Sequence, residues 1–206
     1  MENLKTKVEN RSIVGTVELR AGYKSRHVEG YALKFNTLSK DLGGWNEIIS
    51  KDALRGADFS DVVALFNHNQ DSILARTTSK TLTLEVDKIG LRYSFDAPET
   101  SAGNDLLVSL KRGDVAGSSF AFSVNENGDT WVKTNGQIIR TIAKFETIID
   151  VSPVVNPAYL DTQVALRNFE SFKTLRPELF EQKTLLDKKT KKGYSPDSLT
   201  AEILSL

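Results

Sequence analysis

Residues 11 to 165 contain many short segments in which apolar and polar side chains alternate, separated by turns that contain glycine or asparagine. The stretch TLTLEVDKIGLRYSF, residues 81–95, shows this alternation on both sides of its DKIG turn. Successive side chains of a strand point to opposite faces, so this pattern indicates half-buried strands joined as hairpins. We expect one hairpin here and another between the segments RSIVGTVELRA and VEGYALKF.

Helical spacing is confined to short segments. In TSAGNDLLVSLKRGD, residues 100–114, Leu106, Leu107 and Leu110 fall on one side, and Gly113 ends the pattern. A shorter helix is expected after Ser50, ending near residue 56. This order of elements predicts an α+β, mainly β, fold, namely an antiparallel, barrel-like domain with few helices.

The character of the sequence changes after about Asn168. The remaining residues are rich in charge, with leucine and phenylalanine at loose helical spacing and a lysine cluster before Gly193. We therefore place the main domain at residues 11–165 and a helical, partly mobile C-terminal extension at residues 166–206. The extension is either an arm for interaction or self-processing, or a helix that packs on the domain and stabilises it.

The composition excludes several kinds of chemistry. Lysine plus arginine and aspartate plus glutamate number 27 each, so no net charge draws the chain to nucleic acid or to an anionic membrane. The chain has no cysteine, which removes disulfides, thiolate zinc sites and cysteine nucleophiles. No segment approaches the roughly 18 consecutive apolar residues of a membrane span.

Metal and nucleotide sites also lack their usual patterns. The two histidines, His27 and His68, are far apart in the sequence and outside any His-x-x-x-His pattern. The glycines in DLGGWN and SAGNDL lack the context of a phosphate-binding loop. We therefore expect neither a metal nor a cofactor.

Two adjacent serines open the segment SSFAFSV, residues 118–124. Strand parity places Ser118 on the face of Phe120 and Phe122, and Ser119 on the opposite face. If the aromatic face is the core, Ser118 points inward and Ser119 points outward, where a substrate can reach it. A strand with one wet face also carries serines that have no catalytic role, so parity alone does not identify a nucleophile.

A nucleophilic serine needs a neighbouring base, most often histidine, which a third group orients. His68 ends the apolar segment DVVALF and lies between Asn67 and Asn69, whereas His27 lies in the turn-like segment KSRHVEG. His68 is therefore the candidate base for Ser119. Taken without a partner, it would be a hydrogen-bonded histidine at the end of a strand.

Five motifs follow one another between about Val28 and Thr162: GYALKF, FNHN, TLTLEVDKIGLRYSF, DAPETSAGNDLLVSLKRGDVAGSSFAF and DVSPVVNPAYLDT. This series resembles the prohead, or capsid maturation, proteases of tailed phages, which are related in fold to the herpesvirus assemblins. The resemblance implies a serine endopeptidase in which His68 is the general base and Ser119 the nucleophile. It also implies that Asp150, just before the Val-Ser-Pro motif, is the acid that orients the histidine.

The sequence departs from the family pattern at Ser118, where the family often has methionine, and at Ala121, where it often has glycine. The third catalytic position stays open, because the assemblins use a histidine there and other acids of this chain could serve. These acids are Glu146, Asp71 and Asp114. Candidate donors to the oxyanion are the amides at and near Gly117 and the side chains of Arg112 and Arg167.

The resemblance also implies the partners. The substrates would be the scaffolding protein or the scaffolding segment of the major capsid protein, with self-cleavage and self-association of the protease. Cleavage would take place inside the procapsid, in the cytoplasm of the bacterial host or of a cell that carries the prophage. The alternative is a non-catalytic capsid assembly or scaffold-binding β-barrel protein, in which Ser119 and His68 are structural. A separation of these two side chains far beyond hydrogen-bonding distance would favour it.

Overall fold

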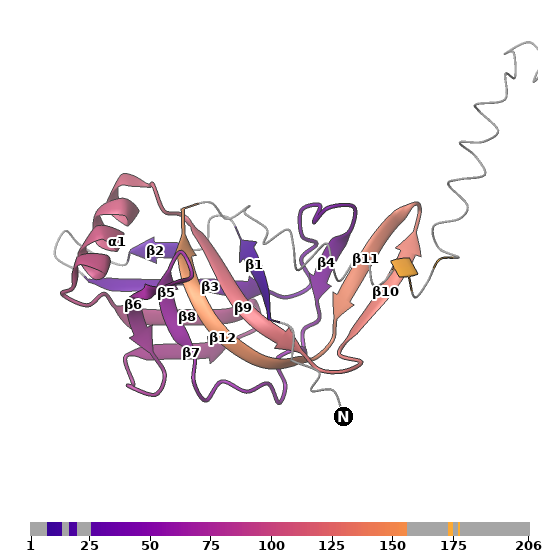
Figure 1. Cartoon of the computed structure of the whole chain (residues 1–206), viewed down its shortest axis with the longest axis horizontal. Coiled ribbons are helices and arrows are strands. Elements are labelled where there is room, and N and C mark those ends of the chain that lie inside the picture. The colour runs from indigo at the N-terminus through magenta and orange to yellow at the C-terminus, as the bar shows by residue number, and fades with distance from the viewer. Residues whose placement is uncertain (1–7, 14–16, 20–25, 156–172, 175–176, 178–206) are drawn as a thin grey trace, which may run out of the picture. The chain divides into compact units, whose positions relative to one another are not determined.

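The fold is known from a computed structural model in which residues 8–13, 17–19, 26–155, 173–174 and 177 are described. The strands of this part form three sheets (Figure 1). The first has the order β1 (Glu9–Ile13), β9 (Gly117–Val124), β12 (Phe145–Val154), β5 (Val63–Phe66) and β6 (Asn69–Arg76). The second has the order β2 (Val17–Leu19), β3 (His27–Lys34), β8 (Gly90–Asp96) and β7 (Leu82–Val86). The third has the order β10 (Asp129–Thr134), β11 (Gln137–Ile142) and β4 (Asn46–Ile49).

The predicted mainly β class with few helices is confirmed. All strand pairs are antiparallel except β12 with β5 and β11 with β4. Within the described ranges the sheets stay open and do not join into one closed barrel. The predicted hairpins are present, because β2 pairs with β3 and β7 pairs with β8.

One helix, α1 (Ser101–Arg112), leads into β9. The side chain of Thr100 accepts a hydrogen bond from the amide of Gly103 and so caps the first turn. Gly113 ends the helix in the left-handed conformation, with φ of 79°, which glycine adopts without a steric penalty. The helix predicted at residues 100–113 is therefore confirmed.

The prediction of a short helix after Ser50 is wrong. Residues 51–56 form consecutive turns, in which the amides of Ala53 and Arg55 each bond to the carbonyl three residues earlier. The amide of Ser50 itself continues the third sheet by donating to Ile142. A segment this short cannot recover the entropy cost of starting an α-helix.

The chain divides into two compact units, Met1–Ala165 and Leu166–Leu206. Apart from residues 173–174 and 177, the predicted helical extension at 166–206 lies outside the described residues. Its two alternatives and the domain bounds of 11–165 stay predictions.

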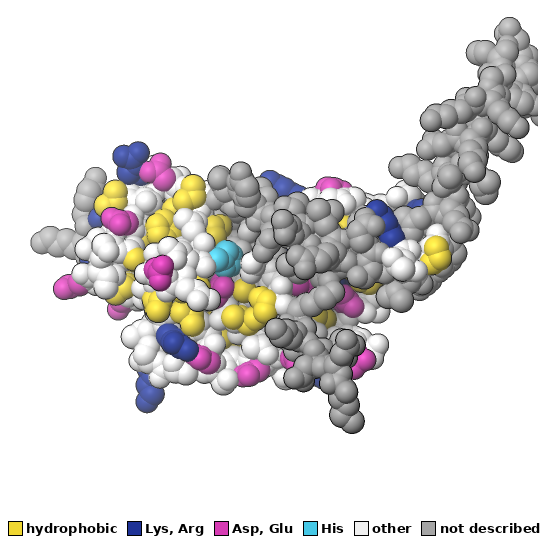
Figure 2. Space-filling view, in the orientation of Figure 1, with side chains coloured by type: hydrophobic (Ala, Val, Ile, Leu, Met, Phe, Trp, Pro, Cys, Tyr) yellow, Lys and Arg dark blue, Asp and Glu magenta, His cyan; other side chains and the backbone are white. Residues whose placement is uncertain are grey.

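No helix of the described part is long and apolar enough to cross a membrane. Acidic and basic side chains are interspersed over the face drawn in Figure 2.

The core face of β9 is aromatic. Phe120 and Phe122 stack with their ring centroids 5.0 Å apart, and Phe145 of β12 meets Phe122 edge-on at the same distance. All residues of β9 from Gly117 to Ser123 are buried, so the opposite face of this strand is covered as well. Figure 1 shows β9 and β12 running side by side as long curved strands. The two serines therefore lie within the protein rather than on a wet face.

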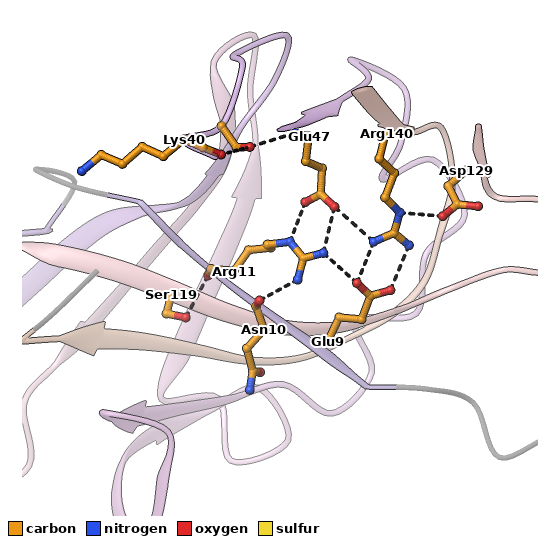
Figure 3. A network of polar contacts seen from close by, with 9 residues as sticks. Glu9, Asn10, Arg11, Lys40, Glu47, Ser119, Asp129 and Arg140 are labelled. Carbon is orange, nitrogen blue, oxygen red and sulfur yellow. Dashed lines mark hydrogen bonds and ion pairs between the residues drawn. The ribbon is translucent and has the colours of Figure 1, made fainter. Parts of the chain in front are cut away.

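A buried cluster of charges joins the first sheet to the third (Figure 3). The Arg11 guanidinium of β1 contacts Glu47 of β4 at 2.8 Å and Glu9 at 2.7 Å. Arg140 of β11 contacts Glu9 at 2.6 Å, Glu47 at 3.1 Å and Asp129 of β10 at 2.5 Å. Every charge of this cluster has an opposite partner, as burial of charged groups requires.

The cluster changes the acidity of its members. Burial raises the pKa of Glu9, but the hydrogen bond and charge of Arg140, followed by those of Arg11, outweigh burial and hold this pKa below its usual value. Burial lowers the pKa of Arg140, and its contacts with Glu9, Glu47 and Asp129 outweigh that effect and raise it. Both groups therefore stay charged in the folded protein at neutral pH.

We predict that Glu9 makes the stability of the protein depend on acid pH. The pKa of Glu9 is lower in the folded chain than in the unfolded chain, where it is about 4.3. Its contribution to stability is therefore present above that pH. The contribution is lost as the pH falls through the folded-state pKa. Thermal unfolding between about pH 6 and about pH 3 should show a falling midpoint, and Glu9→Gln should make this fall smaller.

Glu9→Gln should also lower the free energy of unfolding at neutral pH by about 3 kcal/mol, because it breaks a buried ion pair. The matched control is Glu85→Gln, whose carboxylate lies 3.6 Å from Arg92 and is largely exposed. This control should change stability by less than about 1 kcal/mol. An unaltered pH dependence in Glu9→Gln would contradict the role of the cluster.

Candidate active site

His68 lies in the two-residue turn that joins β5 to β6. Asn67 and His68 have φ of 54° and 57°, and two-residue hairpin turns with positive φ at both positions are of type I′. The second position of this turn usually holds glycine, so a histidine there costs about 1 kcal/mol of backbone strain. The side-chain oxygen of Asn67 accepts a hydrogen bond from the main-chain amide of Val155 at 3.0 Å. The main-chain amide of Asn67 donates to the carbonyl oxygen of Pro153, also at 3.0 Å. These bonds fix the turn against the end of β12.

The turn brings the His68 ring onto two neighbouring strands. Its Nε2 atom lies 2.6 Å from the Ser119 Oγ atom of β9. Its Nδ1 atom lies 2.8 Å from the Asp150 Oδ1 atom of β12. The imidazole is about one quarter exposed, with 25% of its side-chain surface accessible, whereas the Asp150 side chain is 10% exposed. A hydroxyl, an imidazole and a carboxylate thus form one hydrogen-bonded row.

A bulge in β12 places Asp150 on the face of His68. Ile148 pairs with Phe122, and the next paired residue, Asp150, lies opposite Ala121. One extra residue therefore separates the two pairs, and the strand changes which side chains face the core. Ile148 packs in the core, whereas Asp150 points to the same side as Ser119.

The two serines of β9 face opposite sides, as strand parity predicts. The Ser118 Oγ atom lies 2.8 Å from the Tyr93 hydroxyl in the core. Burial raises the pKa of Tyr93, so this pair stays neutral and structural. The expectation that Ser119 is exposed is wrong, because only 1% of this residue is accessible. The His68 ring and strand β1 cover it.

Ser152 was not predicted as a site residue. Its Oγ atom donates to Asp150 Oδ1 at 2.9 Å and lies 3.3 Å from His68 Nδ1, and the residue pairs with Ser119 in the sheet. A signal was present in the sequence, since Asp150 and Ser152 are two positions apart and share one face of a strand. Ser152 can hold the carboxylate in the orientation that meets the imidazole.

The alternative acids and the second histidine do not contact His68. Glu146 accepts from Ser123 at 3.2 Å, and Asp114 pairs with Arg112 at 2.6 Å. The main-chain amide of Asp71 donates to the Asn69 side chain, and no contact joins its carboxylate to His68. His27, the other histidine, contacts Asp96 across β3 and β8. Asp150 is therefore the acid that the structure brings to His68.

Arg167 lies outside the described residues, and the oxyanion donors stay a prediction. Among the described residues, no group of three or more histidine, cysteine, aspartate or glutamate side chains could hold a metal ion.

The row from Ser119 to Asp150 is the arrangement used by serine hydrolases. Residues 15–175 match the family described as caudovirus prohead serine protease. The chain belongs to this family, and the predicted family resemblance is confirmed. Among solved structures, the chain is similar to the bacteriophage T4 capsid assembly protease, gp21, with 12% sequence identity and a TM-score of 0.41. That similarity covers 72% of this chain and 98% of the T4 chain. No curated protein matches the chain.

We predict that Ser152→Ala lowers kcat for peptide cleavage by about tenfold with little change in KM, because Ser152 orients a carboxylate that acts as charge develops. Ser152→Thr, which keeps the hydroxyl, should restore most of the rate. Ser123→Ala is the matched control, since it removes a buried serine hydroxyl that bonds to Glu146. An equal loss in both alanine variants, or no rescue by threonine, would show that Ser152 is only structural.

Proposed function

We propose that Ser119, His68 and Asp150 are the nucleophile, general base and orienting acid of a serine endopeptidase that matures the procapsid. The observation that carries this proposal is the pair of contacts made by one imidazole, 2.6 Å to a serine hydroxyl and 2.8 Å to a carboxylate. Serine is a weak nucleophile without such a base. Membership of the prohead serine protease family supports the same reaction.

The reaction begins with a neutral His68 whose Nδ1–H donates to Asp150, which leaves Nε2 free to accept a proton. As the Ser119 Oγ atom bonds to the carbonyl carbon of the scissile peptide, its proton passes to Nε2. His68 then gives this proton to the leaving amine, the C–N bond breaks, and an acyl-enzyme remains. Water, deprotonated by His68, releases the acid product and restores Ser119. These steps need no cofactor.

Asp150 acts through the histidine. Its carboxylate selects the tautomer with the proton on Nδ1 and stabilises the imidazolium that forms in the transition state. Its side chain is only 10% exposed, so water screens this interaction little. The Ser152 hydroxyl, 2.9 Å from the same oxygen, limits rotation of the carboxylate.

The substrates that we propose are the scaffolding protein, or the scaffolding segment of the major capsid protein, with self-cleavage and self-association of the protease. Cleavage takes place inside the procapsid in the bacterial host. The family, which is described by its action on the prohead, supports this proposal. A large separation of Ser119 and His68 would favour the alternative of a non-catalytic assembly factor, and their distance of 2.6 Å does not.

We predict that Ser119→Ala abolishes processing when the chain is produced together with the capsid and scaffolding proteins of its phage. Loss of the nucleophile should lower the rate by about 10³-fold or more. Mass mapping of the new protein termini measures the cleavage and identifies the cleaved bonds. Ser118→Ala is the matched control and should keep most of the activity, because this hydroxyl bonds to Tyr93 in the core. Unchanged termini in Ser119→Ala would contradict the assignment.

A further inference from the structure

Within the described part of the chain, the Ser119 hydroxyl has two polar neighbours. One is His68 Nε2 at 2.6 Å, and the other is the main-chain carbonyl oxygen of Arg11, in strand β1, at 2.8 Å. Figure 3 shows the second contact, with the Ser119 side chain directed at the backbone of Arg11. The hydroxyl is thus held between the base and a peptide carbonyl group of its own chain.

The hydroxyl has only one proton, so it can donate a hydrogen bond to only one of these two neighbours at a time. When the proton goes to the Arg11 carbonyl oxygen, Nε2 cannot receive it, and the serine is not activated. When the proton goes to Nε2, two oxygen atoms without a proton between them lie 2.8 Å apart and repel each other. The Arg11 carbonyl group therefore competes with His68 for the proton that catalysis must move.

Strand β1 also blocks the approach to the nucleophile. It pairs antiparallel with β9 at the edge of the first sheet, with Ser12 directly opposite Ser119. Ser119 is 1% exposed in this arrangement, so a polypeptide substrate cannot reach it unless a covering element moves. The match to the protease family begins at residue 15, after the last residue of β1.

We infer that β1 occupies the edge of β9 at which the extended backbone of a substrate binds, and that the protease is latent while β1 is in place. This inference rests on the proposed role of Ser119 as the nucleophile. An extended peptide that adds to a sheet edge uses the main-chain hydrogen bonds of that edge. A substrate strand in place of β1 brings one of its own carbonyl groups beside the Ser119 hydroxyl, where Arg11 now lies.

The buried charges allow β1 to leave. Strand β1 contributes one acid and one base to the cluster, Glu9 and Arg11, and therefore departs as a neutral unit. Arg140 then keeps its contacts with Glu47 and Asp129, at 3.1 Å and 2.5 Å, so no buried charge is left without a partner.

One polar atom of β1 is poorly accommodated. The Asn10 side-chain oxygen is buried and has no hydrogen-bond partner within the described part of the chain. A buried acceptor of this kind opposes binding of the strand, because it loses its bond to water. Ion pairs thus hold strand β1 in place, but one of its buried polar atoms lacks a hydrogen bond. This combination suits a segment that must be displaced.

A reversible crosslink between β1 and β9 tests the inference in the full chain. Asn10 lies opposite Ala121, and directly opposed residues of antiparallel strands have Cα distances that a disulfide can span. The chain has no cysteine of its own, so Asn10→Cys combined with Ala121→Cys forms a single defined bond. The matched control combines Thr130→Cys with Thr141→Cys, an opposed pair of β10 and β11 in the third sheet.

The readout is the rate at which an alkyl fluorophosphonate labels Ser119, with oxidised glutathione to close the crosslink and dithiothreitol to open it. The closed β1–β9 crosslink should slow labelling by about tenfold or more relative to the same protein after reduction, because β1 can no longer open. The control pair should be labelled at the same rate in both states. Equal rates in the two states of the β1–β9 pair would overturn the inference and leave the proposed function intact.

A second variant tests the same point without a crosslink. Arg11→Glu places a carboxylate beside Glu9 and Glu47 and so drives β1 away from β9. We expect faster labelling of Ser119 than in the unaltered protein. Slower labelling would show that β1 is a permanent part of the active site. If no form of the protein is labelled at Ser119, the proposed nucleophile itself is contradicted, and the inference fails with it.

Discussion

The proposed active site depends on the hydrogen bond between the Ser119 hydroxyl and the imidazole of His68. Two local departures from regular structure make this bond possible. The turn between β5 and β6 holds a histidine where glycine is usual, and this turns the ring back onto the sheet. The bulge in β12 moves Asp150 to the face of His68. Both departures cost conformational energy, and both serve the placement of the proposed catalytic groups, as strained positions in proteins often do.

The burial of Ser119 connects catalysis to the N-terminal strand. The aromatic core behind β9 fixes the strand, while β1 closes its edge and is held by the buried cluster around Arg11 and Arg140. The carbonyl group that meets the hydroxyl belongs to Arg11, the residue whose side chain enters that cluster. If β1 holds the protease latent, as we infer, Arg11 couples the stability of the cluster to the reactivity of Ser119.

Alternation of apolar and polar residues was sufficient to predict the mainly β fold, the hairpins and the faces of Ser118 and Ser119. Strand parity and the place of His68 at the end of an apolar segment were sufficient to propose the Ser119–His68 pair, and the family resemblance supported it. Asp150 came from the resemblance alone, because contacts between distant strands leave no local pattern. The exposure of Ser119 was predicted wrongly, since the five residues of β1 carry no sign of the strand with which they pair. The bulge beside Asp150 and the Arg11 contact were also out of reach, because a register shift and a backbone carbonyl group are not encoded by residue type.

The most direct test of the central claim is to locate the adduct that a fluorophosphonate forms with the unmodified protein. Attack by an activated serine expels fluoride and leaves one phosphonyl group, which peptide mass mapping assigns to a residue. We predict a single adduct on Ser119, its loss in His68→Ala and much slower formation in Asp150→Asn. An adduct on Ser118, or equal labelling of Ser119 in His68→Ala, would contradict the account.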